Sequence, residues 1–317
     1  MHNYAFLCYP VERNAQGGYR SMQKSSMRAY FLFISSALIF GTIGIFRKYI
    51  PLSSGLLAFS RGVLGGTFLL LFTKCRGHKL QKIEGKKLRL LILTGAIIGL
   101  NWICLFEAYN YTTVATAVMC YYMQPTIVIL LSPIVFKERL TLKKLLCAAT
   151  AIIGMMFVSG MADGTGIGAQ DITGILCGLL AAALYATVVI MNKKVQVEDA
   201  YAKTIIQLAS AAIILIPYLL ITEDFSAISL NGLAIVMVLI VGIVHTGIAY
   251  AMYFGSMKDL KAQTVAVLSY IDPVFALLLS ALLLHEKLTL FGIIGAVLVI
   301  GSALVSETDT GRKNKEG

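Results

Sequence analysis

The sequence predicts an all-α membrane protein with ten transmembrane helices, arranged as two inverted repeats of five. Three observations predict it: an apolar composition, a segment that occurs twice, and basic residues gathered in alternate loops. Of the 317 residues, 58% are hydrophobic and 14% are charged, whereas a soluble domain carries roughly 25% charged residues. An ordinary soluble domain is therefore excluded. The net charge of +11 has its explanation in the loops and does not indicate nucleic-acid binding.

The duplicated segment is the strongest internal signal. Residues 122–141 read YMQPTIVILLSPIVFKERLT, and residues 270–289 read YIDPVFALLLSALLLHEKLT. One offset of 148 positions superposes them without a gap and places Pro125 on Pro273. A duplication this regular predicts two homologous halves.

Apolar segments of about 20 residues, the length that crosses ~30 Å of hydrocarbon, follow one another along both halves. They lie at 29–46, 55–73, 89–108, 114–136 and 142–160 in the first half, and at 172–191, 201–221, 232–254, 262–284 and 290–306 in the second. The predicted domains are thus one repeat at 29–160 and another at 172–306.

The predicted tails are residues 1–28 and 307–317. The first tail is polar and lacks the apolar core of a secretory signal peptide. We expect it to be either a short disordered cytoplasmic tail or a stretch upstream of the natural start, with Met22 or Met27 as the first residue.

The basic residues predict the orientation. If the N-terminus is cytoplasmic, 23 of the 27 Lys and Arg residues fall in cytoplasmic loops and tails, three fall outside, and one lies within a segment. This bias places both termini in the cytoplasm of a multi-pass protein of the cell membrane. Because five is an odd number, the second repeat enters the membrane inverted relative to the first. Inverted repeats of this kind are typical of alternating-access transporters.

Two prolines predict a central cavity. Pro125 and Pro273 lie near the middle of their segments, and a proline removes a helical donor and displaces the carbonyl four residues earlier. Polar backbone at membrane depth has to face protein or a water-filled cavity. We expect a substrate cavity lined by the matched Tyr122, Gln124, Tyr270 and Asp272. The alternative is that the prolines only kink packed helices and that Gln124 bonds a neighbour.

Asp272 is the candidate coupling residue. A carboxyl group at mid-membrane is costly and usually marks an ion or substrate path, so Asp272 could couple transport to protons. The alternative is a neutral carboxylic acid held by one structural hydrogen bond. The matched Gln124 has no group that titrates.

Arg61 lies inside the second segment, and an arginine there needs a partner. Glu107, near the outer end of the third segment, is at comparable depth. If the two pair, they are structural or form part of an outer gate. If they do not, Arg61 could bind a substrate carboxylate or phosphate through two parallel hydrogen bonds.

Weaker candidates follow from the same reasoning. His245 could relay protons or take part in gating, although a single histidine is more often a bonded core residue. Further candidate cavity residues are Asn101, Trp102, Gln207 and Tyr250. Four residues at the ends of the duplicated segments are expected to be structural helix caps: Glu138, Thr141, Glu286 and Thr289.

Several classes of function have no support. The chain contains no G-x-x-x-x-G-K-[ST] motif for ATP and no H-E-x-x-H or G-x-S-x-G motif. An intramembrane aspartyl protease would need a second aspartate in a segment, and only Asp272 lies in one. No cofactor and no metal site are predicted. Membrane lipids are expected partners, and a homodimer is compatible with the sequence. The basic loop 74–89 could touch anionic lipid headgroups, although a solvated cytoplasmic loop is the favoured interpretation.

The doubled endings PIVFKERLT and ALLLHEKLT, the ten segments in two fives and Arg61 in the second segment resemble the EamA-type transporters of the drug/metabolite transporter superfamily. The resemblance covers about residues 30–306. It implies a central cavity between the repeats and a carrier for amino acids or other small metabolites, and it specifies no substrate. We therefore expect a secondary exporter or exchanger for a small polar or amphipathic solute. A passive facilitator or a lipid-scrambling protein is the alternative, and an enzyme is disfavoured.

Overall fold

The computed structural model describes residues 12–136, 141–158, 168–195, 197–227, 231–257, 260 and 268–308. This part of the chain is helical and contains no β-strand, so the predicted all-α class is confirmed. The first half holds α1 (Glu12–Gly41), α2 (Ile43–Lys48), α3 (Ser54–Cys75), α4 (Gly85–Tyr111), α5 (Val114–Tyr121), α6 (Gln124–Phe136) and α7 (Leu142–Val158). The second half holds α8 (Ala169–Lys194), α9 (Ala200–Thr222), η1 (Phe225–Ala227), α10 (Gly232–Leu239), the π-helix η2 (Ile240–Ile248), α11 (Ala249–Met257), α13 (Ile271–Leu283) and α14 (Leu290–Thr308).

Seven helical stretches among the described residues are long and apolar enough to cross a membrane. They are Met27–Lys48, Ser54–Cys75, Gly85–Tyr111, Val114–Leu131, Gln170–Asn192, Ala200–Thr222 and Gly232–Ser256. The apolar helices Ile271–Leu283 and Leu290–Ser302 are shorter. The predicted segment 262–284 begins outside the described residues, as does the tail beyond Thr308. The protein is thus a multi-pass membrane protein.

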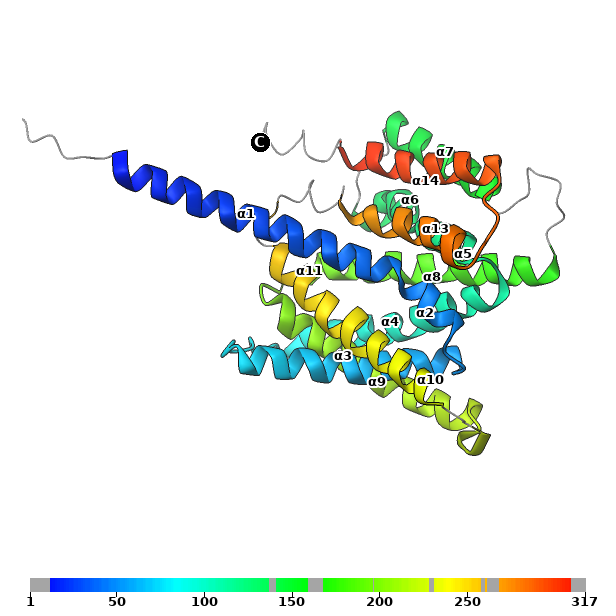
Figure 1. The fold of residues 1–317 in the computed structure, drawn as a ribbon, viewed down its shortest axis with the longest axis horizontal. Helices are drawn as coiled ribbons and strands as arrows, with labels where there is room; N and C mark the ends of the chain where they lie inside the picture. Colours follow the sequence, from blue (N-terminus) through cyan, green and yellow to red (C-terminus); the bar gives the residue numbers. More distant parts are fainter. Residues whose placement is uncertain are drawn as a thin grey trace, which may run out of the picture.

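The N-terminal stretch differs from the prediction. A disordered tail was one of the two expectations for residues 1–28, whereas α1 begins at Glu12 and runs unbroken to Gly41. No proline falls between these residues, so nothing in this stretch removes a helical donor. Figure 1 shows the first turns of α1 extending well beyond the other helices.

Helix packing repeats between the halves. The offset makes α3 the counterpart of α9, α4 of α10–α11, α6 of α13, α7 of α14 and α1 of α8. Contacts between a helix of the first half and a helix of the second have counterparts with the halves exchanged. The α4–α8 contact corresponds to the α11–α1 contact, and the α3–η2 contact corresponds to the α9–α4 contact. In the same way, the α6–α8 contact corresponds to the α13–α1 contact. The matched helices α7 and α14 pack on each other, as do α3 and α9, and the helices lie side by side along one direction (Figure 1).

Two of these matched pairs are antiparallel. In the α3–α9 pair, Gly55 faces Leu219 whereas Gly62, further along α3, faces Leu208, earlier in α9. In the α7–α14 pair, Gly154 faces Val299 whereas Phe157, further along α7, packs on Phe291, earlier in α14. A Cβ on Gly154 would lie 2.7 Å from the Gly295 carbonyl oxygen. The absence of a side chain is therefore what permits this contact.

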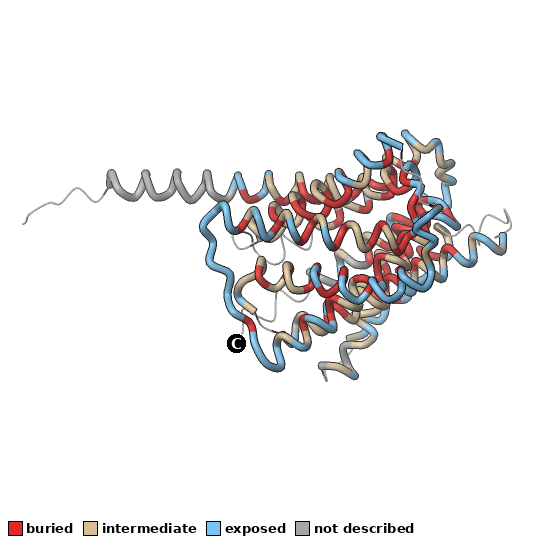
Figure 2. Tube along the Cα trace, turned by 90° about the horizontal axis from the view of Figure 1, so that it is seen from below, coloured by how far each residue is buried: buried red, intermediate tan, exposed pale blue. Residues whose placement is uncertain are grey.

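The outer surface of the bundle is apolar. Buried residues run through the middle of the helices and exposed residues lie outside (Figure 2), with Leu57 and Phe106 fully buried. Large apolar side chains are nevertheless exposed on the outside, including Ile221 at 84% and Ile134 at 78%. Such a surface suits a hydrocarbon solvent and not water.

The predicted caps are present where the structure describes them. Thr141 Oγ1 accepts a hydrogen bond from Lys144 N at 3.3 Å, and Thr289 Oγ1 accepts one from Gly292 N at 3.0 Å. Glu286 also caps a helix, but it caps α5 of the other half instead of the adjacent α14. Glu138 lies outside the described residues.

Candidate functional site

The duplicated Tyr-x-Gln/Asp-Pro element interrupts a helix in both halves. α5 ends at Tyr121, Tyr122 and Met123 form a turn, and α6 begins at Gln124. In the other half Tyr270 precedes the first residue of α13. Pro125 and Pro273 therefore stand in the first turns of α6 and α13, where a helix does not need the missing N–H.

The two interrupted helices meet through their polar residues. Tyr122 Oη donates a hydrogen bond to Asp272 Oδ2 at 2.7 Å, and the rings of Tyr122 and Tyr270 lie 6.2 Å apart. Residues 150 positions apart thus join the matched elements of the two halves. Gly41, at the α1–α2 junction, packs against this site, since a Cβ there would lie 2.8 Å from the Asp272 carbonyl oxygen.

Gln124 lies beside this contact with an unused acceptor. Its Oε1 is buried and accepts no hydrogen bond within the part of the chain that the structure describes. An unsatisfied buried acceptor costs about 1–3 kcal/mol. Its neutral side chain therefore offers a polar group that a bound molecule could satisfy.

Arg61 is buried without an acidic partner among the described residues. Its Nε donates to Thr246 Oγ1 at 3.1 Å, and its guanidinium lies over the rings of Trp102, at 4.3 Å, and Phe106, at 5.4 Å. A desolvated cation–π contact stabilises by about 2 kcal/mol. No described residue accepts a hydrogen bond from Nη1 or Nη2, so the forked end of the side chain keeps donors for an anion.

The Arg61–Glu107 ion pair, one of the two expectations for Arg61, is not formed. Glu107 Oε2 instead accepts a hydrogen bond from Asn110 Nδ2 at 3.3 Å. Trp102 and Phe106 lie four residues apart and share the face of α4 that meets Arg61. Glu107 is one residue further on and is turned away from that face by about 100°.

Tyrosine side chains gather around the Tyr122–Asp272 contact. The Tyr109 ring lies 6.4 Å from the ring of Phe106, over which the Arg61 guanidinium packs. Tyr121 packs on Tyr122, with ring centroids 6.0 Å apart. These rings form an aromatic cluster around the half-buried Asp272 carboxyl group.

The other predicted residues mainly hold helices together. Gln207, which aligns with Arg61, donates to Thr94 Oγ1 and Asn192 Oδ1, both at 2.9 Å. Asn101 Nδ2 donates to the Ala181 carbonyl at 2.6 Å and thereby joins α4 to α8.

Tyr250 and His245 lie on the helix that faces Arg61. Tyr250 packs on Phe40 with ring centroids 5.5 Å apart. His245 Nε2 contacts Thr42 Oγ1 at 2.7 Å, and Nδ1 contacts the Ile240 carbonyl at 3.4 Å. Both ring nitrogens of His245 are engaged, as expected of a bonded core histidine.

Sequence reasoning missed Thr246, Tyr109 and Tyr185. Thr246 is in the π-helix η2, a rare form that often marks functional sites, and nothing in the sequence predicts it. Tyr185 packs on Tyr121 at 5.6 Å. The sequence did show that Tyr109 and Tyr185 are tyrosines in or next to apolar segments, which is one indication of a polar site. With fifteen tyrosines in the chain, that indication is unspecific.

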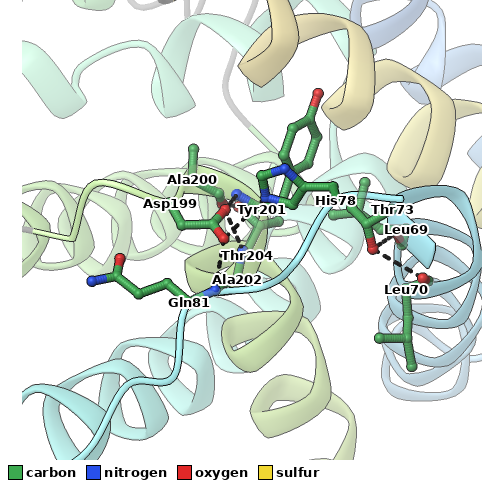
Figure 3. Close-up of polar contacts among 10 residues, drawn as sticks. All are labelled: Leu69, Leu70, Thr73, His78, Gln81, Asp199, Ala200, Tyr201, Ala202 and Thr204. Atoms are coloured by element: carbon green, nitrogen blue, oxygen red, sulfur yellow. Dashed lines mark hydrogen bonds and ion pairs between the residues drawn. The ribbon is translucent and has the colours of Figure 1, made fainter. Parts of the chain in front are cut away.

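A separate polar cluster joins the α3–α4 connection to the start of α9 (Figure 3). Asp199 Oδ1 caps α9 by accepting from Tyr201 N and Ala202 N, at 3.0 and 3.1 Å. Its Oδ2 accepts from Gln81 N at 3.0 Å and pairs with His78 Nε2 at 3.1 Å. Partial burial raises the pKa of the Asp199 carboxyl, but the hydrogen bonds that it accepts lower this pKa by more. The pKa therefore lies below its ordinary value of 3.8.

Metal chemistry has no evident site here. Across the described ranges, no group of three or more His, Cys, Asp or Glu side chains could hold a metal ion. The cysteines of these ranges are free thiols, and their burial ranges from buried to exposed.

Several known proteins are similar to this chain in sequence. A protein of Bacillus subtilis named "Uncharacterized transporter YxxF" is 28% identical over 297 residues, covering 93% of this chain and 94% of its own. An "Uncharacterized transporter" of Clostridium kluyveri is 24% identical, covering 90% of this chain and 95% of its own. "Protein PecM" of Dickeya dadantii is 23% identical, covering 87% of this chain and 90% of its own. A solved crystal structure with 20% sequence identity superposes with a TM-score of 0.63 over 90% of this chain and shows the same fold.

The family match covers both halves. The model of the EamA-like transporter family matches residues 27–160 and again residues 172–308. The two matches coincide with the two halves that the duplicated segment defines. The chain belongs to the EamA-like transporter family.

Proposed function

We propose that this protein is a secondary carrier that moves a small metabolite across the cell membrane by alternating access, as an exporter or exchanger. Ten segments would cross the bilayer as two inverted repeats. The observation that carries the proposal is the Tyr122–Asp272 hydrogen bond, which joins the matched helix interruptions of the two repeats. In inverted-repeat carriers, the substrate site lies where such discontinuous helices meet.

The packing pattern supports inversion. The matched pairs α3–α9 and α7–α14 pack antiparallel, as expected if one repeat is turned over relative to the other. Figure 1 shows the α3–α4 and α8–α9 connections at one end of the bundle and the α13–α14 connection at the other. The basic loop 74–89 would mark the first end as cytoplasmic.

The polar groups suit a zwitterionic or amphipathic solute such as an amino acid. The free Nη donors of Arg61 would bind a carboxylate or phosphate bidentately. Asp272 would bind an amine, and the aromatic rings that pack at Arg61 and at Tyr122 would cover the apolar part of the molecule. Gln124 Oε1, buried without a partner among the described residues, would add a further hydrogen bond.

Asp272 is the candidate for coupling to protons. The Asp272 carboxyl group would bind either a proton or the amine of the substrate, but not both at once. Proton binding on one side of the membrane would then be linked to substrate binding on the other side. Tyr122 would hold Asp272 in place, because its hydroxyl already donates to Oδ2. A gradient or exchange would then supply the energy.

Counterflow in proteoliposomes tests the proposal. Purified protein loaded with an excess of unlabelled amino acid should accumulate the radiolabelled form transiently and with saturation. Tyr122→Phe should reduce this counterflow, whereas Tyr218→Phe, at a half-exposed tyrosine of α9, should not. Uptake that rises linearly with concentration and shows no counterflow would mean a passive facilitator.

A further inference from the structure

An apolar groove opens between α7 and α14 on the outside of the bundle. Its volume is about 610 Å³, within the ~300–1,000 Å³ typical of small-molecule sites. The lining residues include Leu142, Leu146, Val297, Leu298 and Val305, with Lys143 at one end. The groove is separate from the Tyr122–Asp272 junction.

The groove exists because the two helices diverge. α7 and α14 touch through Gly154 and Gly295. Two turns further along α14, a Cβ on Gly301 would meet nothing within 4 Å. The space between the helices therefore widens from the glycine contact toward the N-terminal end of α7.

The walls of the groove favour a hydrocarbon chain. Leu142 is 72% exposed and Val297 is 65% exposed. The two hydroxyl groups in the lining bond within their own helices: Thr150 Oγ1 donates to the Leu146 carbonyl and Ser302 Oγ to the Val299 carbonyl, both at 2.9 Å. Neither hydroxyl offers its proton to a ligand.

Charge at the open end indicates the headgroup. Lys143 is the second residue of α7 and lines the groove where α7 begins. A basic group beside a groove between transmembrane helices on the cytoplasmic side is suited to an anionic lipid headgroup.

We infer that this groove binds one acyl chain of an anionic phospholipid, with the lipid phosphate at Lys143. The assignment to the cytoplasmic leaflet rests on the orientation proposed above. Lipid binding in the groove does not depend on whether the protein is a carrier. A single lysine near an anionic surface contributes ~1 kcal/mol, which corresponds to about a five-fold preference for an anionic over a zwitterionic lipid.

Native mass spectrometry of the purified full chain tests this inference. Phosphatidylglycerol and phosphatidylcholine with identical acyl chains are added separately, and the fraction of protein carrying one lipid is compared. Phosphatidylglycerol should bind about five-fold more tightly. Lys143→Gln should remove this difference, and Lys287→Gln, the same charge change at the α13–α14 connection, should preserve it.

A second pair of variants tests the groove. Gly301→Leu should fill the space and lower the occupancy of both lipids, whereas Gly232→Leu, at a glycine of α10 with equally open surroundings, should not. Equal binding of the two lipids by the natural sequence would overturn the inference. So would a lipid-free dimer that Gly301→Leu disrupts, because the groove would then be an interface between copies. Counterflow measured in parallel keeps this outcome separate from that of the proposed carrier function.

Discussion

Glu286 Oε1 accepts a hydrogen bond from the backbone N–H of Val114 at 2.9 Å, and its Oε2 accepts one from Ala115 at 3.2 Å. The carboxylate thus caps the first turn of α5 from 172 positions away. It supplies both acceptors and negative charge to a helix N-terminus. In the proposed topology this contact closes the outer end of the junction between repeats, and it would have to break when that end opens.

Loss of this cap should destabilise the protein. Glu286→Ala should lower the free energy of unfolding by about 0.5–2 kcal/mol, the usual effect of removing a helix cap, and should lower the thermal unfolding midpoint in detergent. Glu198→Ala, at an exposed acidic residue outside the helices, is the matched control. An unchanged midpoint for Glu286→Ala would show that the α5 cap contributes nothing to stability.

Asp272→Asn should separate the two modes of transport. The amide retains an acceptor for the Tyr122 hydroxyl but carries no titratable proton, so uptake driven by a proton gradient should be lost while exchange persists. Both modes are measured on the same proteoliposomes, with and without an imposed pH difference. Gradient-driven uptake at the natural rate would exclude Asp272 as the coupling residue.

The sequence predicted more of the fold than of the site. The apolar lengths and the duplicated segment located the helices, because hydrophobic length and repetition are local properties of the chain. The partner of Arg61 depends on which face of α4 meets α3. Phe106 and Glu107 are adjacent in sequence but point about 100° apart around the axis of α4. The partner of Glu286 depends on how the two halves pack against each other. Neither the offset between the repeats nor the composition of the chain predicts that packing.

Arg61→Gln should weaken substrate binding without unfolding the protein. A hydrogen bond to a charged group contributes about 1.5–3 kcal/mol, so the apparent KM for a carboxylate-bearing substrate should rise roughly 10- to 150-fold. Arg61→Lys should not restore it, since a lysine lacks the planar fork that stacks on Trp102. The matched control is Arg76→Gln, whose guanidinium also lies over a ring, that of Phe72 at 5.2 Å, but at the end of the bundle. Equal effects of the two variants would exclude a specific anion site at Arg61.

The Asp199 cluster should make stability depend on acid pH. The pKa of the Asp199 carboxyl is lowered in the folded protein, so the folded state binds this proton less readily than the unfolded chain. The contribution to stability is therefore complete above the ordinary value of 3.8 and is lost as the pH falls through the lower folded pKa. Thermal unfolding midpoints followed from neutral pH into this acid range should fall more steeply for the natural sequence than for Asp199→Asn, which has no carboxyl to protonate. Glu198→Gln, one position earlier in the same connection, is the control, and its unfolding midpoints should depend on pH as those of the natural sequence do. If the midpoints of all three proteins depend on pH in the same way, Asp199 does not hold loop 76–84 against α9.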